Sequence, residues 1–200
     1  MDKSYKNDTD RQDTAMPVIR PIRRSDIAEC VTIYNRYITE TTSTFEIEPL
    51  TAEAFDARVS GLCRQYPFLV CTDGACGRVL GYAYLSPYGE RAAYRFTCDV
   101  SVYLDMEERG RGLGRMLYQA LEAEAVRRGF YSMVAIVTGE NAASMEFHAR
   151  MGFSRMAEFP EMGYKFGRWL SVCYYRKRLR TPIPGEIPIE LLPQDIPYLS

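Results

Sequence analysis

A glycine-rich turn between a predicted strand and a predicted helix is the strongest candidate for chemistry in this sequence. It reads Arg109-Gly110-Arg111-Gly112-Leu113-Gly114. The first N–H groups of a helix have no partner within the helix, and the helix dipole adds partial positive charge there. Glycines allow an anion to approach the backbone, and Arg109, Arg111 and Arg115 add charge. The turn predicts a pyrophosphate site, with a plain tight connection as the alternative.

The spacing of these glycines separates the turn from two common nucleotide motifs. The glycines fall at every second position, which does not match the dinucleotide pattern Gly-x-Gly-x-x-Gly. No lysine of the Walker type follows Gly114. A nucleotide triphosphatase is therefore disfavoured.

A second set of polar residues is predicted to share one face of a later helix. Asn141, Ser144 and His148 stand at positions i, i+3 and i+7. Phe147 and Met151 adjoin this stripe and are predicted to face the core, which would place the stripe at the edge of a cleft. Instead of contacting a ligand, Asn141 could simply cap the helix. His148, the single histidine, could likewise have a purely structural role.

Hydrophobic periodicity places these residues in one α/β domain. The predicted order is strand, helix, helix, three strands, helix, strand, helix and two strands. Predicted strands cover residues 18–22, 68–72, 79–85, 97–104, 133–137, 153–159 and 170–178. A first helix is predicted to begin after a cap at Ser25. Three further helices are predicted over residues 51–65, 113–128 and 142–150.

The composition favours a small-molecule partner and a location in the cytosol. The formal net charge of −1 provides no broad basic field for a nucleic acid. No apolar run approaches the ~20 residues needed to cross a bilayer, and the polar start does not look like a signal peptide. Six cysteines without a Cys-x-x-Cys pair favour neither a disulfide framework nor a metal site.

Both ends of the chain differ in composition from the predicted domain, which covers residues 17–180. Residues 1–16 are polar and aperiodic, which predicts a flexible extension. Residues 181–200 contain five prolines, which predicts an extended arm. The apolar residues of this arm predict that it lies on the body or on a second subunit; they are Ile187, Ile189, Leu191 and Leu192.

Two motifs in this order resemble the GNAT superfamily of N-acetyltransferases. The segment Val100-Ser101-Val102-Tyr103-Leu104 followed by Arg-x-x-Gly-x-Gly at 109–114 is similar to the family's pyrophosphate loop. Asn141-Ala142-Ala143-Ser144, with 147–153 after it, is similar to the second signature. The resemblance covers residues 18–178. It narrows to the phosphinothricin acetyltransferase-like group through Ile33-Tyr34-Asn35-x-Tyr37, Gly81-Tyr82-Ala83-Tyr84 and Gly163-Tyr164-Lys165-Phe166-Gly167-Arg168-Trp169.

The resemblance implies a GNAT fold, with a mixed central sheet of about six to seven strands flanked by about four helices. It also implies acetyl-CoA as the donor co-substrate and no metal. The residues implied to hold acetyl-CoA are Val102, Tyr103, Leu104, Arg109, Gly110, Arg111, Gly112, Leu113, Gly114, Arg115, Asn141, Ser144 and Arg150.

The resemblance also implies two catalytic residues. His148 stands where many members have a tyrosine that reprotonates the departing thiolate, and the phosphinothricin group shares the histidine. An amine must lose a proton before it attacks a thioester, so a nearby carboxylate is useful. Asp99 is that candidate, but the resembling enzymes generally have glutamate there. The shorter side chain favours proton transfer through a water molecule.

Five residues are candidates for contacting the acceptor. Arg91 and Tyr94 lie in the segment that resembles the acceptor loop, where an arginine pairs well with a carboxylate or phosphinate. Lys165, Phe166 and Trp169 are expected to close the acceptor pocket or simply to pack a loop.

The sequence therefore predicts direct acetyl transfer to the primary amine of a small amino-acid-like acceptor such as phosphinothricin, methionine sulfone or methionine sulfoximine. The oxyanion is expected to meet a backbone N–H near Tyr103 or Leu104. Two alternatives stay open: acetylation of peptide N-termini and a non-catalytic acyl-CoA sensor. Members of the family are often dimers, so a homodimer is expected.

Overall fold

The computed structural model describes residues 16–186, 188, 190 and 191. The predicted N-terminal extension therefore lies outside the described residues, except for Met16. Ile187, Ile189 and Leu192 of the predicted arm also lie outside them, whereas Leu191 packs against the core. None of the described helices is long and apolar enough to cross a membrane.

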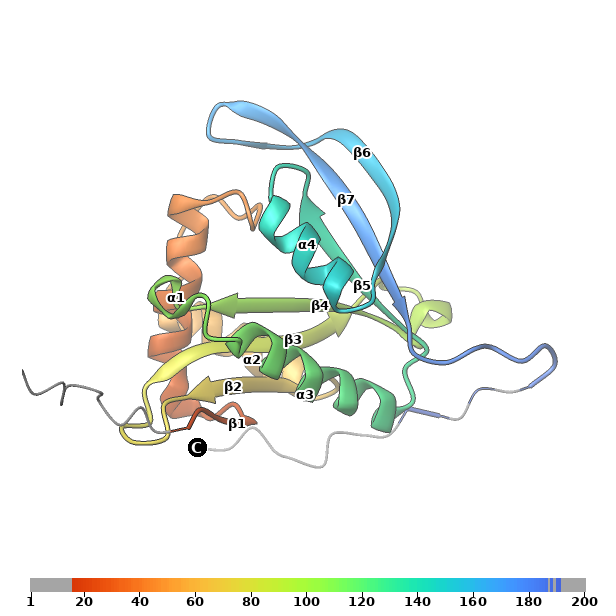
Figure 1. Ribbon diagram of the computed structural model, residues 1–200, viewed down its shortest axis with the longest axis horizontal. Helices are drawn as coiled ribbons and strands as arrows, with labels where there is room; N and C mark the ends of the chain where they lie inside the picture. The colour runs from red at the N-terminus through yellow and green to blue at the C-terminus, as the bar shows by residue number, and fades with distance from the viewer. Residues whose placement is uncertain (1–15, 187, 189, 192–200) are drawn as a thin grey trace, which may run out of the picture.

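The described residues form one mixed sheet of seven strands in the order β1-β2-β3-β4-β5-β7-β6 (Figure 1). The strands are β1 (Val18–Pro21), β2 (Phe68–Thr72), β3 (Val79–Pro87), β4 (Thr97–Leu104), β5 (Ser132–Thr138), β6 (Ser154–Lys165) and β7 (Arg168–Arg178). The helices are α1 (Ile27–Glu40), α2 (Ala52–Cys63), α3 (Leu113–Arg128) and α4 (Ala142–Arg150), with 3-10 turns η1 (Arg24–Asp26), η2 (Ala92–Tyr94) and η3 (Met106–Glu108). The predicted element order and sheet size are confirmed.

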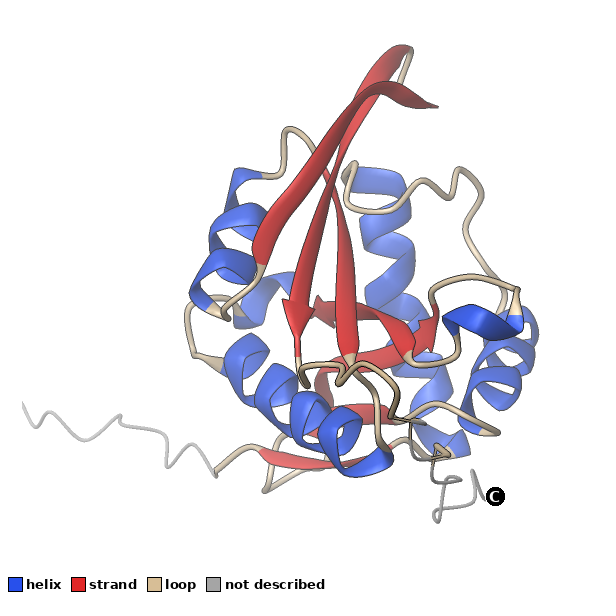
Figure 2. Cartoon of the chain, turned by 90° about the vertical axis from the view of Figure 1, so that its right-hand side faces the viewer, coloured by secondary structure: helices blue, strands red, loops and turns tan. Residues whose placement is uncertain are grey.

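Helices cover both faces of the sheet, as Figure 2 shows. On one face, α3 and α4 pack on a core that includes Cys98, Val100 and Tyr175. On the other face, α1 and α2 pack on a second core rich in aromatic rings, which includes Tyr34, Phe55 and Tyr82. Because successive side chains of a strand point to opposite faces, each central strand serves both cores.

The sheet divides where β4 meets β5, its one parallel pairing. Only Thr97, Cys98 and Asp99 of β4 pair with β5, opposite residues 132–134. Beyond Asp99 the two strands diverge, and Figure 1 shows β5 rising with β7 away from β4. The rest of both strands is left without a partner on that side, which opens the middle of the sheet.

Two sequence predictions about element ends were wrong. Ser25 does not cap α1, because it lies inside η1. Asp26 stands at the cap position instead, and its carboxylate accepts hydrogen bonds from the Arg23 N–H at 2.7 Å and from Arg20 at 2.7 Å. A buried ion pair with Arg20 thus replaces the expected serine cap.

The last hairpin is longer than predicted. β6 extends to Lys165, six residues past the predicted end at Phe159, and turns into β7 through Phe166 and Gly167. The pairing register shifts between Phe159 and Gly163, where Glu161 has a φ of 57°. A bulge of this kind admits Pro160, which signals a strand end in the sequence.

Candidate functional site

A cleft of about 330 Å³ opens between the diverging parts of β4 and β5. Its walls come from both strands, from α4, and from the segment that follows α1. The lining residues are Tyr37, Ser43, Val100, Ser101, Val102, Tyr103, Leu104, Arg109, Gly114, Ala135, Ile136, Val137, Thr138, Asn141, Ala143, Ser144, Phe147 and His148. The sheet therefore supplies unpaired backbone on each side of an elongated slot.

The backbone of β4 offers alternate residues to this cleft. The Asp105 N–H donates to Leu80 O at 2.9 Å, and β4 pairs in register with β3 from Leu104 back to Cys98. Since hydrogen-bonding groups alternate along a strand, Tyr103 directs its N–H to β3, whereas Val102 and Leu104 direct theirs to the cleft. The Leu104 N–H meets the Tyr37 hydroxyl at 3.3 Å. Of the two residues expected near the oxyanion, only Leu104 directs its N–H to the cleft.

The glycine turn shapes a second hollow that continues the cleft between α3 and α4. Gly110 and Gly112 have φ values of 82° and 77°, and a Cβ at either would meet nothing within 4 Å. Gly112 is the N-cap of α3, so its neighbours present free N–H groups to this open space. The hollow, about 850 Å³, shares Leu104, Gly114 and Phe147 with the cleft. The two form one continuous groove.

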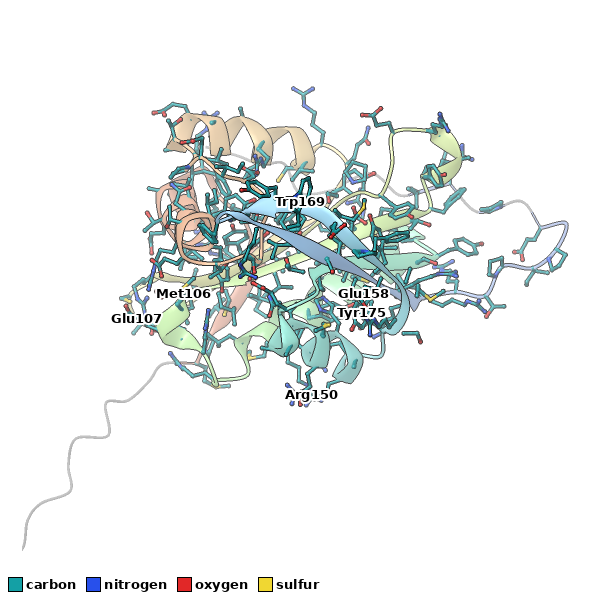
Figure 3. All side chains as sticks on the ribbon, turned by 90° about the horizontal axis from the view of Figure 1, so that it is seen from above. Met106, Glu107, Arg150, Glu158, Trp169 and Tyr175 are labelled. Atoms are coloured by element: carbon teal, nitrogen blue, oxygen red, sulfur yellow. The ribbon has the colours of Figure 1, made fainter. Side chains whose placement is uncertain are left out.

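The arginines around the turn have different surroundings. Arg109 lines the cleft, and Arg115 and Arg150 line the hollow. Figure 3 shows Arg150 at the end of α4. These three arginines therefore lie along the lining of the groove.

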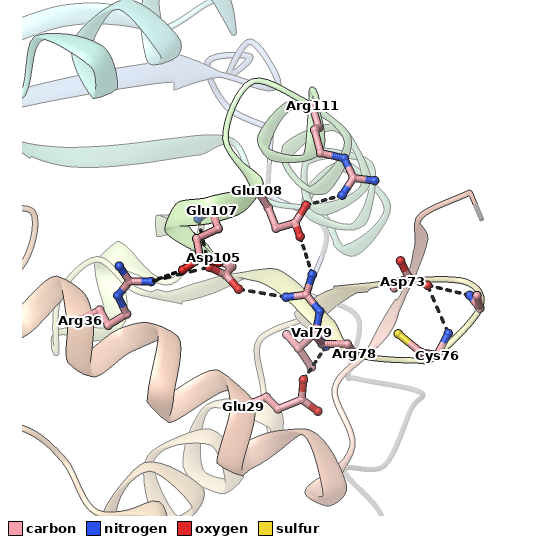
Figure 4. Close-up of polar contacts among 11 residues, drawn as sticks. Glu29, Arg36, Asp73, Cys76, Arg78, Val79, Asp105, Glu107, Glu108 and Arg111 are labelled. Carbon is pink, nitrogen blue, oxygen red and sulfur yellow. Dashed lines mark hydrogen bonds and ion pairs between the residues drawn. The ribbon is translucent and has the colours of Figure 1, made fainter. Parts of the chain in front are cut away.

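Among the described residues Arg111, unlike Arg109 and Arg115, is held in an ion-pair network. Its guanidinium pairs with Glu108, which also pairs with Arg78 at the start of β3 (Figure 4). Arg78 donates to Asp105 at 3.0 Å as well, and its hydrogen bond to Glu108 lowers the pKa of that carboxyl. Arg111 therefore ties the turn to the β2–β3 hairpin, a role that local sequence did not indicate.

The predicted polar stripe on α4 lines the cleft. The Asn141 Oδ1 accepts a hydrogen bond from the Ser144 N–H at 3.0 Å, and its Nδ2 donates to Ser43 Oγ at 3.0 Å. Asn141 is thus a helix cap, as the plain alternative held, and it also joins α4 to the segment after α1. Phe147, expected to face the core, lies at the cleft surface as well.

His148 is buried, with 8% of its surface exposed, among the rings of Phe147, Phe153 and Tyr175. Its Nδ1 lies 2.8 Å from the Ser144 carbonyl oxygen. Since a carbonyl only accepts, Nδ1 carries the proton and Nε2 of the neutral ring has a free lone pair. Burial lowers the pKa of His148, which favours this neutral form at pH 7.

Asp99 stands where β4 and β5 begin to diverge. Its neighbours Cys98 and Val100 point into the core under α3, so Asp99 points to the opposite face of the sheet. Its Oδ1 is buried and has no hydrogen-bond partner among the described residues. Burial raises the pKa of this carboxyl to about 7. A carboxylate in this state is suited to accept a proton near neutral pH.

None of the five residues predicted to contact the acceptor lines the cleft. Arg91 and Tyr94 lie at η2 and are exposed, outside the cleft lining. Lys165 is buried, and its Nζ donates to Thr44 O at 2.7 Å. Phe166 and Trp169 lie exposed at the turn of the β6–β7 hairpin, where Figure 3 labels Trp169.

The sequence did not indicate the role of residues 42–45, a segment after α1 of which Ser43 lines the cleft. The Thr42 Oγ1 donates to Glu140 at 2.7 Å, and Phe45 packs directly on Gly163 of β6. Together with the bonds of Ser43 and Thr44 described above, these contacts join α1 to the opposite side of the sheet. The polar run carried no periodic signal, so only the tertiary contacts show its role.

Comparison with known proteins settles the family. The model of the "Acetyltransferase (GNAT) family" matches residues 30–153, more than half of the chain. The chain belongs to this family. The resemblance of the glycine turn and of the α4 motif to GNAT enzymes is thereby confirmed, and so is the GNAT fold.

Relatives of this GNAT chain extend over most of its length. An L-methionine sulfoximine/L-methionine sulfone acetyltransferase of Pseudomonas paraeruginosa is 37% identical over 80% of this chain and 94% of its own. A phosphinothricin acetyltransferase from Sinorhizobium meliloti, solved with acetyl-CoA, has a TM-score of 0.80 and 29% identity, over 90% of this chain and 97% of that one.

A different acceptor appears among the structural neighbours of the family. A ribosomal-protein-alanine N-acetyltransferase from Brucella melitensis has a TM-score of 0.75 and 29% identity, over 81% of this chain and 99% of that one. The fold alone therefore does not decide the acceptor.

Proposed function

We propose that this GNAT enzyme transfers the acetyl group of acetyl-CoA directly to the primary amine of a small amino-acid-like acceptor of the phosphinothricin, methionine sulfone or methionine sulfoximine type. The observation that carries the proposal is the continuous groove from the glycine turn to the point where β4 and β5 diverge. Asp99 and His148 belong to opposite faces of the sheet at that point.

Acetyl-CoA fits this groove by the chemistry of its parts. The diphosphate takes the open space at Gly110 and Gly112, where the N–H groups of α3 and Arg109 favour an anion. The amides of the pantetheine arm pair with the outward-facing backbone of Val102 and with the Asn141 side of the cleft. The thioester then lies near the junction of β4 and β5.

Gly112→Ala is expected to raise the KM for acetyl-CoA about tenfold with little change in kcat. Alanine at a φ of 77° is strained by ~1–2 kcal/mol, and its methyl group enters the open space assigned to the diphosphate. Steady-state kinetics and calorimetry with acetyl-CoA measure this effect.

Gly77→Ala is the matched control for Gly112→Ala. Gly77 has a φ of 75° and equally open surroundings, but it lies in the β2–β3 turn. The Gly77→Ala variant should have a lower melting temperature than the wild type and an unchanged KM for acetyl-CoA. Equal KM values for the Gly112 variant and the wild type would remove the turn from the cofactor site.

Proton transfer completes the proposed reaction. Asp99 takes the proton of the acceptor amine, directly or through water, and the nitrogen attacks the thioester carbonyl. From the α4 side, the unprotonated Nε2 of His148 accepts the proton that the nitrogen loses after the C–N bond forms, and passes it to the departing thiolate. The new C–N bond replaces the C–S bond, so no acyl-enzyme is needed.

The segment 42–45 supports a small acceptor over a peptide. A peptide N-terminus needs an open groove for the residues that follow it. Here the segment is hydrogen-bonded to Glu140, Asn141 and Lys165 on the far side of the cleft, and Phe45 lies on the hairpin. This closure leaves room for a compact molecule and obstructs an extended chain.

A substrate screen tests the proposal. Phosphinothricin, methionine sulfone, methionine sulfoximine, a polyamine and short peptides are each incubated with acetyl-CoA, and free thiol is measured together with the mass of the product. We expect thiol release with the amino-acid analogues. Release with the peptides alone would favour an N-terminal acetyltransferase, and saturable acetyl-CoA binding with no thiol release would indicate a sensor.

We also propose that the enzyme is a cytosolic homodimer. All six cysteines lie within the described residues as free thiols, which suits a reducing compartment. The β6–β7 hairpin exposes a row of large apolar side chains, which suits burial against a second copy. They are Met156, Phe159, Met162, Tyr164, Phe166 and Trp169.

A further inference from the structure

Arg176 of β7 lies on the same face of the sheet as Asp99. Asp99 pairs in register with Val134, and Val134 pairs in register with Arg176. The neighbouring Tyr175 points into the core under α4, so Arg176 points away from it, to the side that Asp99 also faces. The three residues form a row across β4, β5 and β7.

The charge of Arg176 has no counter-ion in this row. Its Nε and Nη2 donate to the Ser132 hydroxyl at 3.1 Å and 3.0 Å, and no carboxylate among the described residues pairs with it. A half-buried guanidinium bonded to a single neutral hydroxyl keeps several N–H donors available. Such a group favours an anionic partner, and a planar carboxylate matches its geometry.

The hydrogen bond to Ser132 also fixes where this charge lies. Ser132 pairs with Thr97, two residues before Asp99 on the same face. Diagonal neighbours on adjacent strands are ~7–8 Å apart. The amine and the carboxylate of an α-amino acid are attached to the same carbon. With one hydrogen bond of ~2.9 Å from each group to the protein, an α-amino acid spans about the distance between such diagonal neighbours.

We infer that Arg176 binds the α-carboxylate of the acceptor while Asp99 faces its amine. The inference rests on the proposed function and narrows the acceptor to α-amino acids with a free carboxylate. Peptide N-termini and polyamines lack that group next to the reacting nitrogen. The opposed charges of Asp99 and Arg176 would also orient the amino acid, with its side chain toward the exposed Ile136.

The test compares methionine sulfone with the primary amine that lacks its carboxylate. Arg176→Gln is expected to lower kcat/KM for methionine sulfone by about 10- to 100-fold, the usual worth of hydrogen bonds to a charged group. It should leave kcat/KM for the carboxylate-free amine within about twofold of the wild type. The advantage given by the carboxylate would then be lost in the variant.

Three further variants make the result specific. Arg178→Gln, an exposed arginine two residues along the same face of β7, should preserve the preference for the carboxylate. Ser132→Ala keeps the charge but removes the hydroxyl that positions it, so it should reduce the preference less than Arg176→Gln does. Arg91→Gln tests the arginine that the sequence predicted for this role.

Three outcomes would overturn the inference about Arg176. The first is an equal loss for both compounds in Arg176→Gln, which would show a structural bridge between β5 and β7. The second is no loss for either compound, and the third is loss of the preference only in Arg91→Gln. Wild-type enzyme that acetylates neither compound, but releases thiol with peptides, would overturn the proposed function itself.

Discussion

Asp99→Asn is expected to lower kcat by ~10²- to 10⁴-fold, the range found for a positioned general base. Asparagine has nearly the same shape but cannot take the amine proton. The KM for acetyl-CoA should change little, because Asp99 faces away from the cofactor groove. Steady-state kinetics with an amino-acid acceptor measure both quantities. A kcat within twofold of the wild type would remove Asp99 from the reaction.

The pH dependence gives Asp99 an independent signature. Burial raises the pKa of its carboxyl to about 7, so kcat/KM of the wild type should rise through that pH as the base form appears. The Asn variant should lack this limb of the profile. The same limb in both proteins would assign the titration to another group.

The Asp99→Asn variant should be less active than the wild type but more stable. Between its ordinary pKa of 3.8 and about 7, Asp99 holds its proton in the folded state but releases it when unfolded. The free energy of unfolding therefore falls as the pH rises through this window. Asp99→Asn should be the more stable protein at pH 8, as thermal unfolding at two pH values would show.

His148→Ala is expected to lower kcat by about 100-fold, within the usual range for proton transfer. The ring has its Nδ1–H on the Ser144 carbonyl and its Nε2 free, so it is oriented for one proton-transfer role. The cavity left among Phe147, Phe153 and Tyr175 should accept imidazole, and added imidazole should restore part of the rate.

His148→Gln separates catalysis from packing. Glutamine fills much of the same space and keeps a donor for the Ser144 carbonyl, but it has no titratable group. It should lose activity as His148→Ala does while unfolding at a higher temperature. Full activity of the glutamine variant would assign His148 to packing alone.

The sequence predicted the elements and motifs well because these depend on local patterns. Alternation and helical spacing indicated each strand and helix, and the Gly112 turn and the Asn141 stripe follow directly from neighbours in the chain. The part of the site that lies on one helix or one turn could therefore be predicted.

The remainder depends on contacts between distant residues. The sequence predicted Arg111 as a phosphate ligand, but it did not show that Glu108 joins Arg111 to Arg78 of another hairpin. Nothing near Thr42 in the sequence shows that it meets Glu140, and nothing near Asp99 shows that its carboxyl is buried without a partner. The strand predicted over 153–159 continues to Lys165 because a register shift after Phe159 accommodates Pro160.

The short pairing between β4 and β5 leaves backbone groups of both strands facing the cleft. Three residue pairs join the two strands directly, and the core under α3 and the segment 42–45 hold the two sides of the sheet together elsewhere. A bound pantetheine arm would supply the missing rungs of the ladder, acting as a stretch of strand that the gene does not encode. The donor would then be both the reagent and a bridge between the two diverging strands.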